Sequence, residues 1–549
     1  MMRRVLSVLA VGLVTALAVP AAAGAAPGFV ETAVSDPITA LPPVSAPDTP
    51  HCTVTAMRHD FANSYGVPFT GTLVPPAACP GPWTKVVLDW TGSVAGRQFD
   101  RLLNVFVANT EVFRSSTPEP TPTGITWHVA KDISEFIPLL RTSQPLTVDL
   151  GNIVDNTYTG VFHTTLSVTY YRTGRRYPPA QTADAVVSLA QPTATNDGAY
   201  TLGPGGTATT TVSLPRDITA ARLEVYARGG GCDEQWFTAV PSDLAAKYPD
   251  FLCGGGPYRE VQVTLDGLPA GVAQVYPVVY TGGIVPTLWR PVPAIDAFVT
   301  QPYTLDLTPF AALLSNGRPH TVTLTPYGDN DYWLVDATLF LDENPRGTAT
   351  TGALTMDSLT LAPTVATIQT PQPDGSTLVS VRVDRAWTIS GYVNTPHGTL
   401  TTTVRTQSAY TNTDRVSDAG KHQVVRQRDA GTVTVTGGAS VRRDTWSYPI
   451  DVDATVVSFV DGNNYDLRAS VAQGRQLSTW DRGRLLALTD DSVTATGVLA
   501  RTAGTVTESD GSAVEHYTGT DDTGRCYDRL VTADHGLVTG DRLRRCRLP

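Results

Sequence analysis

The stretch that decides the fold is WTKVVLDWTGSVAGRQFDRLLNVFV, residues 83–107. Two apolar runs, residues 86–90 and 102–107, lie on either side of a connection that contains glycine. Short apolar runs separated by turn formers are typical of strands, so the stretch predicts a strand, a loop and a second strand. Asp100 and Arg101 stand where the second strand begins. An Asp–Arg pair at that place can be an ordinary solvated ion pair, and its residues alone leave that interpretation open.

The composition of the chain extends this pattern of strands and turns. At 549 residues the chain is too long for one ordinary core, which predicts two to four domains. Thr, Val, Gly and Pro are abundant and long amphipathic runs at helical spacing are nearly absent, so the expected fold class is all-β. The formal net charge of −11 is spread without long blocks of one sign. This charge pattern gives no footprint for nucleic acid binding.

The N-terminus has the features of an exported protein. Residues 1–25 combine a basic start, an apolar run and small residues near the end, which is the pattern of a signal peptide. No later stretch is apolar and long enough to span a bilayer, so we expect a secreted, extracellular protein without membrane insertion. Residues 26–50 are rich in Pro, Ala, Ser and Thr without periodicity, which predicts a flexible leader.

The cysteines favour disulfide bonds. Six cysteines in an exported protein are first interpreted as disulfides, although six permit 15 connectivities. Wide gaps in the sequence separate three local couples, which we expect to be the pairs: Cys52 with Cys79, Cys232 with Cys253, and Cys526 with Cys546. No CxxC spacing, HExxH motif or histidine cluster favours a metal site. We therefore expect neither a metal nor another cofactor.

An internal duplication organises the first two thirds of the chain. Residues 132–150 and 306–324 align without a gap and share the order of short helix, turn and strand, with Thr308 as the expected N-cap of the second helix. This order predicts two similar β domains in tandem, residues 51–195 and 196–346. Residues 347–549 alternate Thr and Val between turn formers, which predicts a further β-rich C-terminal module without catalytic spacing.

A second acidic candidate lies in GGGCDEQWFT, residues 229–238. Three glycines beside Cys232 place Asp233 and Glu234 on a constrained turn. Such a turn can exist for backbone reasons alone, and a functional role is an equal alternative. No GxSxG, SxxK or phosphate-binding glycine loop is present, which disfavours a serine hydrolase or a nucleotide enzyme.

These segments resemble the peptide-N-glycosidase A family, whose members cut N-glycans from asparagine. The resemblance rests on GRQFDR before an apolar strand, on FRSSTPEPT shortly after it, and on the Gly-rich segment with an acidic pair followed by aromatics. The more distant F-type bacterial glycosidase has WDR opening a strand, which matches residues 99–101, and a Cys-flanked acid that matches Glu234. The similarity covers about residues 52–345 and implies two jelly rolls side by side, with the site in the cleft between them.

The resemblance implies hydrolysis of the amide between an asparagine side chain and N-acetylglucosamine, giving aspartate and a glycosylamine. Asp100 would be the general base, and Arg101 would hold that carboxylate or the glycan by charge-assisted bonds. Glu234, from the other domain, would hydrogen-bond the amide nitrogen or the first sugar and pass a proton to the leaving group. Two neighbouring carboxylates would also split their titrations and leave one proton available.

Three further residues are candidates for binding the substrate. Asn152 stands where the F-type enzyme has a third acid, so the task of holding substrate would fall to an amide. Trp289 and Arg290 lie in a Pro-rich loop, where an aromatic face and a guanidinium group can contact sugars. The expected partners are N-glycosylated peptides or glycoproteins, and the expected state is a monomer. Two alternatives stay open: a glycoside hydrolase that uses the same carboxylates, and a non-catalytic glycan-binding surface protein.

Overall fold

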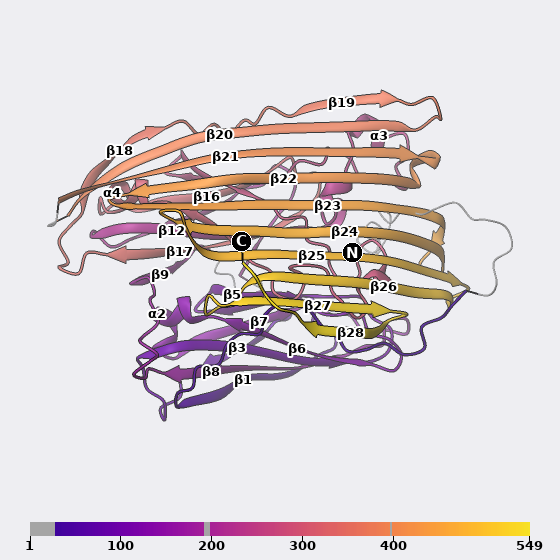
Figure 1. Ribbon diagram of the computed structural model, residues 1–549, viewed down its shortest axis with the longest axis horizontal. Helices are drawn as coiled ribbons and strands as arrows, with labels where there is room; N and C mark the ends of the chain where they lie inside the picture. Colours follow the sequence, from indigo (N-terminus) through magenta and orange to yellow (C-terminus); the bar gives the residue numbers. More distant parts are fainter. Residues whose placement is uncertain (1–27, 191–197, 396–397, 549) are drawn as a thin grey trace.

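The computed structural model describes residues 28–190, 198–395 and 398–548, and it is built almost entirely from strands (Figure 1). The predicted signal peptide lies outside these residues. The expected all-β class is confirmed. Within the described ranges, every helix is too short or too polar to cross a lipid bilayer.

The first sandwich consists of two four-stranded antiparallel sheets. In spatial order, one sheet contains β1 (His51–Phe61), β8 (Phe162–Arg172), β3 (Trp83–Val94) and β6 (Ile125–Asp132). The other contains β2 (Phe69–Leu73), β7 (Gln144–Leu150), β4 (Leu102–Val107) and β5 (Thr110–Ser116). Trp90 of β3 and Val105 of β4 belong to one buried core, so the two sheets pack face to face. The quoted stretch forms the predicted strand, loop and strand.

The second sandwich repeats this arrangement. One sheet contains β10 (Tyr200–Leu202), β17 (Trp333–Glu343), β12 (Ile218–Gly229) and β15 (Tyr303–Asp306). The other contains β11 (Ala208–Val212), β16 (His320–Tyr327), β13 (Glu260–Leu265) and β14 (Leu268–Gln274). The relative strand order equals that of the first sandwich, as the duplication predicts. β9 (Ala185–Ser188) pairs with β17, so this sheet recruits a strand from before the expected border.

The duplicated short helices are present in both sandwiches. They are η1 (Ser134–Phe136) with α2 (Ile137–Leu140), and η5 (Thr308–Phe310) with α4 (Ala311–Leu314). Asp132 Oδ1 accepts a hydrogen bond from the Ser134 amide at 2.9 Å, and Asp306 Oδ1 accepts one from the Thr308 amide at 2.9 Å. The prediction of Thr308 as N-cap is wrong, because Leu307 occupies that position and the aspartate side chain holds the first turn instead. The remaining helices are η2 (Gly231–Asp233), η3 (Trp236–Thr238), α3 (Ser242–Ala245), η4 (Pro286–Trp289) and η6 (Asp418–Gly420).

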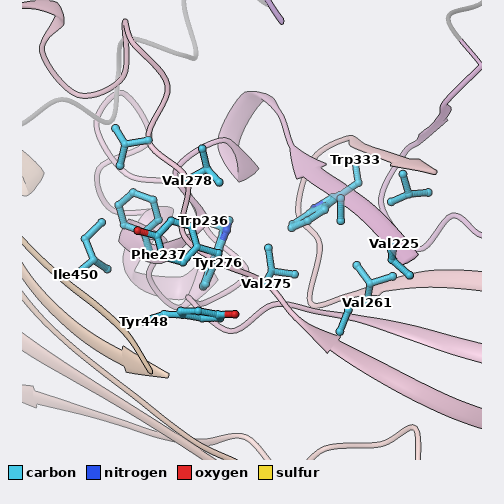
Figure 2. Close-up of a cluster of buried hydrophobic side chains, with 14 of the residues drawn as sticks. Val225, Trp236, Phe237, Val261, Val275, Tyr276, Val278, Trp333, Tyr448 and Ile450 are labelled. Atoms are coloured by element: carbon cyan, nitrogen blue, oxygen red, sulfur yellow. The ribbon is translucent and has the colours of Figure 1, made fainter. Parts of the chain in front are cut away.

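The C-terminal module is a single 11-stranded antiparallel sheet, whose long strands run from orange to yellow across Figure 1. In spatial order its strands are β18 (Thr351–Asp357), β20 (Thr377–Thr395), β21 (Gly398–Ser417), β22 (His422–Gly437), β23 (Ser440–Asp461), β24 (Asn464–Asp481), β25 (Arg484–Thr502), β26 (Thr505–Thr520), β27 (Cys526–Asp534) and β28 (Leu537–Leu543), with β19 (Ala366–Pro371) also on β20. Figure 2 shows Tyr448 and Ile450 of β23 beside Tyr276 and Phe237 of the second sandwich. The Tyr276 and Tyr448 rings meet edge to face at 5.0 Å. This shared core fixes the sheet to the second sandwich.

Residues 28–50 differ from the expected flexible leader. The Glu31 amide donates to the Ser509 carbonyl oxygen at 3.0 Å, and the Ala40 amide donates to Glu515 Oε2 at 2.7 Å. Further along the chain, Lys85 Nζ of the first sandwich lies 2.5 Å from Asp522 Oδ2 of the C-terminal module. The leader is therefore held along the C-terminal sheet, because buried carboxyl and carbonyl oxygens of that sheet take up its amides.

The three expected disulfides are confirmed: Cys52–Cys79, Cys232–Cys253 and Cys526–Cys546. Each of them closes a loop within a single part of the fold. The second one closes a loop that starts next to Glu234.

Buried acids of the C-terminal sheet predict that the protein is most stable in acid. Burial raises the pKa of Asp414 and of Asp429 to about 7, against partly offsetting hydrogen bonds from Gln423 and Trp446. A carboxyl group with a raised folded-state pKa contributes stability below its unfolded pKa and loses it as pH rises through the folded value. We therefore expect the free energy of unfolding to fall as pH rises from about 4 to 7, by about 1.4 kcal/mol per pH unit for each of the two acids, and the melting temperature to fall with it.

Thermal unfolding of the wild type and of the Asp414→Asn/Asp429→Asn variant at several pH values checks this expectation. The variant should lose part of the slope, because an amide does not titrate. Identical slopes in the two proteins would show that these acids do not set the pH dependence.

Candidate active site

Asp100 lies at the seam between the two sandwiches. It stands two positions before the first residue of β4, and its half-buried carboxylate accepts a hydrogen bond from the Gly282 amide of the second sandwich. A Cβ added at Gly282 would lie 2.5 Å from Asp100 Oδ1. The close approach of backbone to carboxylate therefore requires glycine at position 282.

Thr117 joins the same two loops. The Arg101 amide donates to Thr117 Oγ1 at 2.9 Å, and Thr281 Oγ1 donates to the Thr117 carbonyl oxygen at 2.5 Å. The residue after Asp100 and the residue before Gly282 are thus bonded to one threonine. This arrangement fixes the position of Asp100 relative to the second sandwich.

The Gly-rich segment after β12 presents Glu234 from the other side. A Cβ at Gly230 would meet the Tyr332 ring at 2.1 Å, and Gly231 has a φ of +59°, a conformation that favours glycine. Cys232, bonded to Cys253, follows directly. The three glycines therefore let the chain turn sharply against the end of β17.

Asp233 and Glu234 differ in burial and in partners. Asp233 is fully buried and accepts hydrogen bonds from Arg259 Nη2 at 2.6 Å, Trp333 Nε1 at 2.7 Å and the Asn330 amide at 2.8 Å. The Glu234 side chain is 24% exposed. Asp233 anchors the turn in the core, whereas Glu234 remains partly accessible to solvent.

Arg228 connects the two acids. Its Nη2 donates to Glu234 Oε2 at 3.2 Å, and its guanidinium lies 4.7 Å from the centre of the Tyr280 ring. Burial raises the pKa of Glu234, the positive charge of Arg228 lowers it, and the negative charge of Asp100 raises it. The pKa of Asp100 is also raised by burial and lowered by the Gly282 amide, Arg101 and Arg228. The two carboxyl groups therefore act on one another and share one arginine.

Arg101 and Asn152 form a layer behind Asp100. Arg101 donates to Gln98 Oε1 at 2.6 Å and to Asn152 Oδ1 at 3.3 Å. Asn152 is fully buried, and its amide nitrogen donates to the carbonyl oxygens of Phe61 and Gly160, each at 3.0 Å. The expected direct contact between Asn152 and substrate does not fit this burial. Asn152 is connected to Asp100 through its hydrogen bond with Arg101.

Trp289 and Arg290 have different surroundings. Trp289 is 3% exposed and donates from Nε1 to the Gly283 carbonyl oxygen at 2.9 Å. The prediction of a sugar contact is wrong for Trp289, because the ring is buried in the core and braces the loop that carries Gly282. Arg290 Nη2 lies 3.4 Å from Glu119 Oε2, so this guanidinium reaches the seam.

Three groups at the seam were not found by sequence reasoning: Glu119, Arg228 and Gly282. Glu119 stands inside the quoted segment FRSSTPEPT, but no spacing rule connects it with Asp100. Arg228 precedes Glu234 by six residues, at the end of β12, and its charge was the one available signal.

The fold and the seam define a class of protein: an all-β protein in which two half-buried carboxyl groups, one from each of two tandem sandwiches, are both influenced by the charge of one arginine. The family model of peptide N-acetyl-beta-D-glucosaminyl asparaginase amidase A matches residues 40–359, and the model of the PNGase_A C-terminal domain matches residues 378–450. A curated relative, peptide-N4-(N-acetyl-beta-glucosaminyl)asparagine amidase A of Prunus dulcis, is 32% identical over 403 residues, which cover 70% of each chain. The chain belongs to this family of amidases.

Two solved structures are more distant. PNGase F, a glycosylasparaginase from Flavobacterium meningosepticum, is 13% identical, with a TM-score of 0.36 over 54% of this chain and 96% of that one. PNGF-II is 14% identical, with a TM-score of 0.38 over 54% of this chain and 66% of that one.

Proposed function

We propose that the protein hydrolyses the amide bond between an asparagine side chain and N-acetylglucosamine in N-glycosylated peptides. The products are aspartate in the peptide and a glycosylamine on the glycan. The observation that carries the proposal is that Arg228, which donates a hydrogen bond to Glu234 of its own sandwich, also acts through its charge on Asp100 of the other sandwich. Membership of the amidase family supports the same reaction.

In the proposed mechanism Asp100 takes a proton from a water molecule as that water attacks the amide carbon. General-base catalysis needs an ionised group within hydrogen-bond reach of the water, and the half-buried carboxylate of Asp100 faces the seam. The Gly282 amide and Arg101 support the ionised form by lowering the pKa of Asp100 against the effect of burial.

Glu234 serves the leaving group. When the C–N bond breaks, the departing nitrogen needs a proton, and an amine leaves far more readily than its anion. Burial and the charge of Asp100 both raise the pKa of Glu234, which favours its protonated form. Arg228, 3.2 Å from Glu234 Oε2, supplies a fixed positive charge for the carboxylate that remains after proton transfer.

We also propose that the protein acts outside the cell, as a monomer, on glycopeptides or glycoproteins. The three disulfides support export, because such bonds persist in oxidising compartments.

The reaction is tested by incubating the purified protein with a peptide that carries a single N-glycan, in water enriched in heavy oxygen. Mass spectrometry should find aspartate at the former glycosylation site, with one heavy oxygen in its new carboxyl group. A glycoside hydrolase would instead leave at least one sugar on asparagine and place the label on the sugar. Unchanged peptide would favour the non-catalytic glycan-binding alternative.

A further inference from the structure

A third carboxyl group lies beside Asp100 and has no role in the mechanism above. The Glu119 side chain is 7% exposed. A Cβ added at Gly282 would lie 2.8 Å from Glu119 Oε1 and 2.5 Å from Asp100 Oδ1. Both carboxyl groups therefore approach the same point of the second sandwich, from the same side of the seam.

Arg290 is the residue that contacts Glu119, and charges from two other parts of the chain act on this pair. Arg290, directly after η4, lies 3.4 Å from Glu119 Oε2 and also 3.8 Å from Glu31 Oε2 of the leader. The C-terminal sheet contributes one positive charge, Arg501 of β25, that lowers the pKa of Glu119. Arg501 donates hydrogen bonds to the Tyr465 hydroxyl at 2.9 Å and to the Gly504 carbonyl oxygen at 3.0 Å. The leader thus contacts the arginine that pairs with Glu119, and the C-terminal sheet acts on Glu119 through the charge of Arg501.

Several charged or titratable groups act on Glu119 or share its arginines: Asp100, Arg101, Tyr158, Arg290, Glu31, Tyr465 and Arg501. Burial is the largest effect and raises the pKa of Glu119 to about 8; Arg290, Arg101 and Arg501 lower it, and Asp100 raises it. Burial therefore favours the protonated form of Glu119 up to about pH 8.

We propose that Glu119 is a third carboxyl group of the amidase site, a positioning residue that must be neutral for turnover and whose charge is set in part by the C-terminal sheet through Arg501. This inference rests on the proposed function. It gives the C-terminal module a part in the reaction, beyond its packing on the second sandwich.

Electrostatics gives the reason for the neutral form. Water attack on the amide places negative charge on the former carbonyl oxygen, next to the Asp100 carboxyl group. A further negative charge on Glu119 would oppose that charge in a partly desolvated site, where interactions between charges are strong. A protonated Glu119 fills the same space without this cost, and Arg290 keeps it beside Gly282.

The slope of the alkaline limb of the pH profile of kcat/KM tests the proposal. With Glu234 and Glu119 both required in protonated form, kcat/KM of the wild type should fall by about two decades per pH unit once both ionise. Glu119→Gln keeps the shape and removes the ionisation, so its limb should fall by about one decade per unit, while kcat/KM below neutral pH stays within about threefold of the wild type.

Arg501→Gln provides a second variant away from the acids. Loss of its positive charge should raise the pKa of Glu119, so the steeper part of the limb moves to higher pH. Arg468→Gln, on the neighbouring strand β24 and paired with Asp466 and Glu508, is the matched control and should leave the limb in place. Melting curves show whether each variant is folded.

The outcomes separate this inference from the proposed function. Suppose the wild type is active, the alkaline limb of Glu119→Gln has the same slope as that of the wild type, and the limb of Arg501→Gln lies at the same pH. This result would overturn the role of Glu119 and leave the amidase reaction intact. Folded Glu119→Gln that is inactive at every pH would also overturn it, because a neutral isostere would then not suffice. Absence of deglycosylation by the wild type would refute the proposed function itself.

Discussion

Asp100→Asn is expected to lower kcat/KM for a glycopeptide by about a hundredfold to ten-thousandfold, the range that a general base contributes. The amide has the size of the carboxylate, and its oxygen can still accept the hydrogen bond from the Gly282 amide. It cannot take a proton from water. The loss should therefore fall on kcat, with little change in KM or in melting temperature.

Asp89→Asn is the control for this substitution. Asp89 lies on β3 of the same sandwich, is paired with His128 and is 30% exposed. This variant should be as active as the wild type. Equal activity of Asp100→Asn and wild type would exclude Asp100 as the base, and a large fall in stability would point to a structural role instead.

Asp233→Ala is expected to destabilise the protein by about 3–5 kcal/mol, the cost of removing one partner from a buried ion pair. Both side chains of the Asp233–Arg259 pair are 0% exposed, so the substitution leaves a buried guanidinium without its carboxylate. The Trp333 indole and the Asn330 amide lose their acceptor as well. The turn that presents Glu234 should then loosen, and activity should fall together with stability.

Denaturant unfolding measures this effect, with Asp250→Ala as the matched control. Asp250 is exposed and lies within the loop that the Cys232–Cys253 disulfide closes. Its replacement should change the unfolding free energy by less than about 0.5 kcal/mol. A similar small effect for Asp233→Ala would show that the anchor of the turn lies elsewhere.

The parts of the fold that could be predicted are those set by local pattern. The apolar runs and turn formers of residues 83–107 predicted its two strands. The gap-free repeat predicted two similar β domains, and the two sandwiches share the same relative strand order. Sequence-local cysteines gave the disulfides. For the C-terminal module, alternating Thr and Val indicated strands, but a single sheet that shares a core with Tyr276 depends on long-range packing that no local window contains.

The site could be predicted only in part, for the same reason. Asp100 and Glu234 stood next to local signals, a strand start and a constrained glycine turn. Gly282 and Glu119 come close to Asp100 only because one sandwich packs on the other, and no local sequence pattern indicates that packing. Trp289 followed the ordinary behaviour of a large aromatic residue in a β domain and lies in the core.

The leader shows a further limit of composition. Residues 28–50 lack any periodic pattern, and a chain of that composition is usually flexible when nothing contacts it. Here, acceptors on the C-terminal sheet fix it, and Glu31 pairs with Arg290 near the seam. Two of the contacts that order this segment, Glu31 with Ser509 and Ala40 with Glu515, join residues more than four hundred positions apart in the sequence.

A double-mutant cycle on kcat/KM, with Asp100→Asn, Glu234→Gln and the combination of both, tests the central claim most directly. If the two acids serve one reaction at one seam, the double variant should be scarcely slower than the slower single variant, because either loss alone already disables the same step. Losses that multiply would mean that the acids act independently, and that result would contradict a shared site.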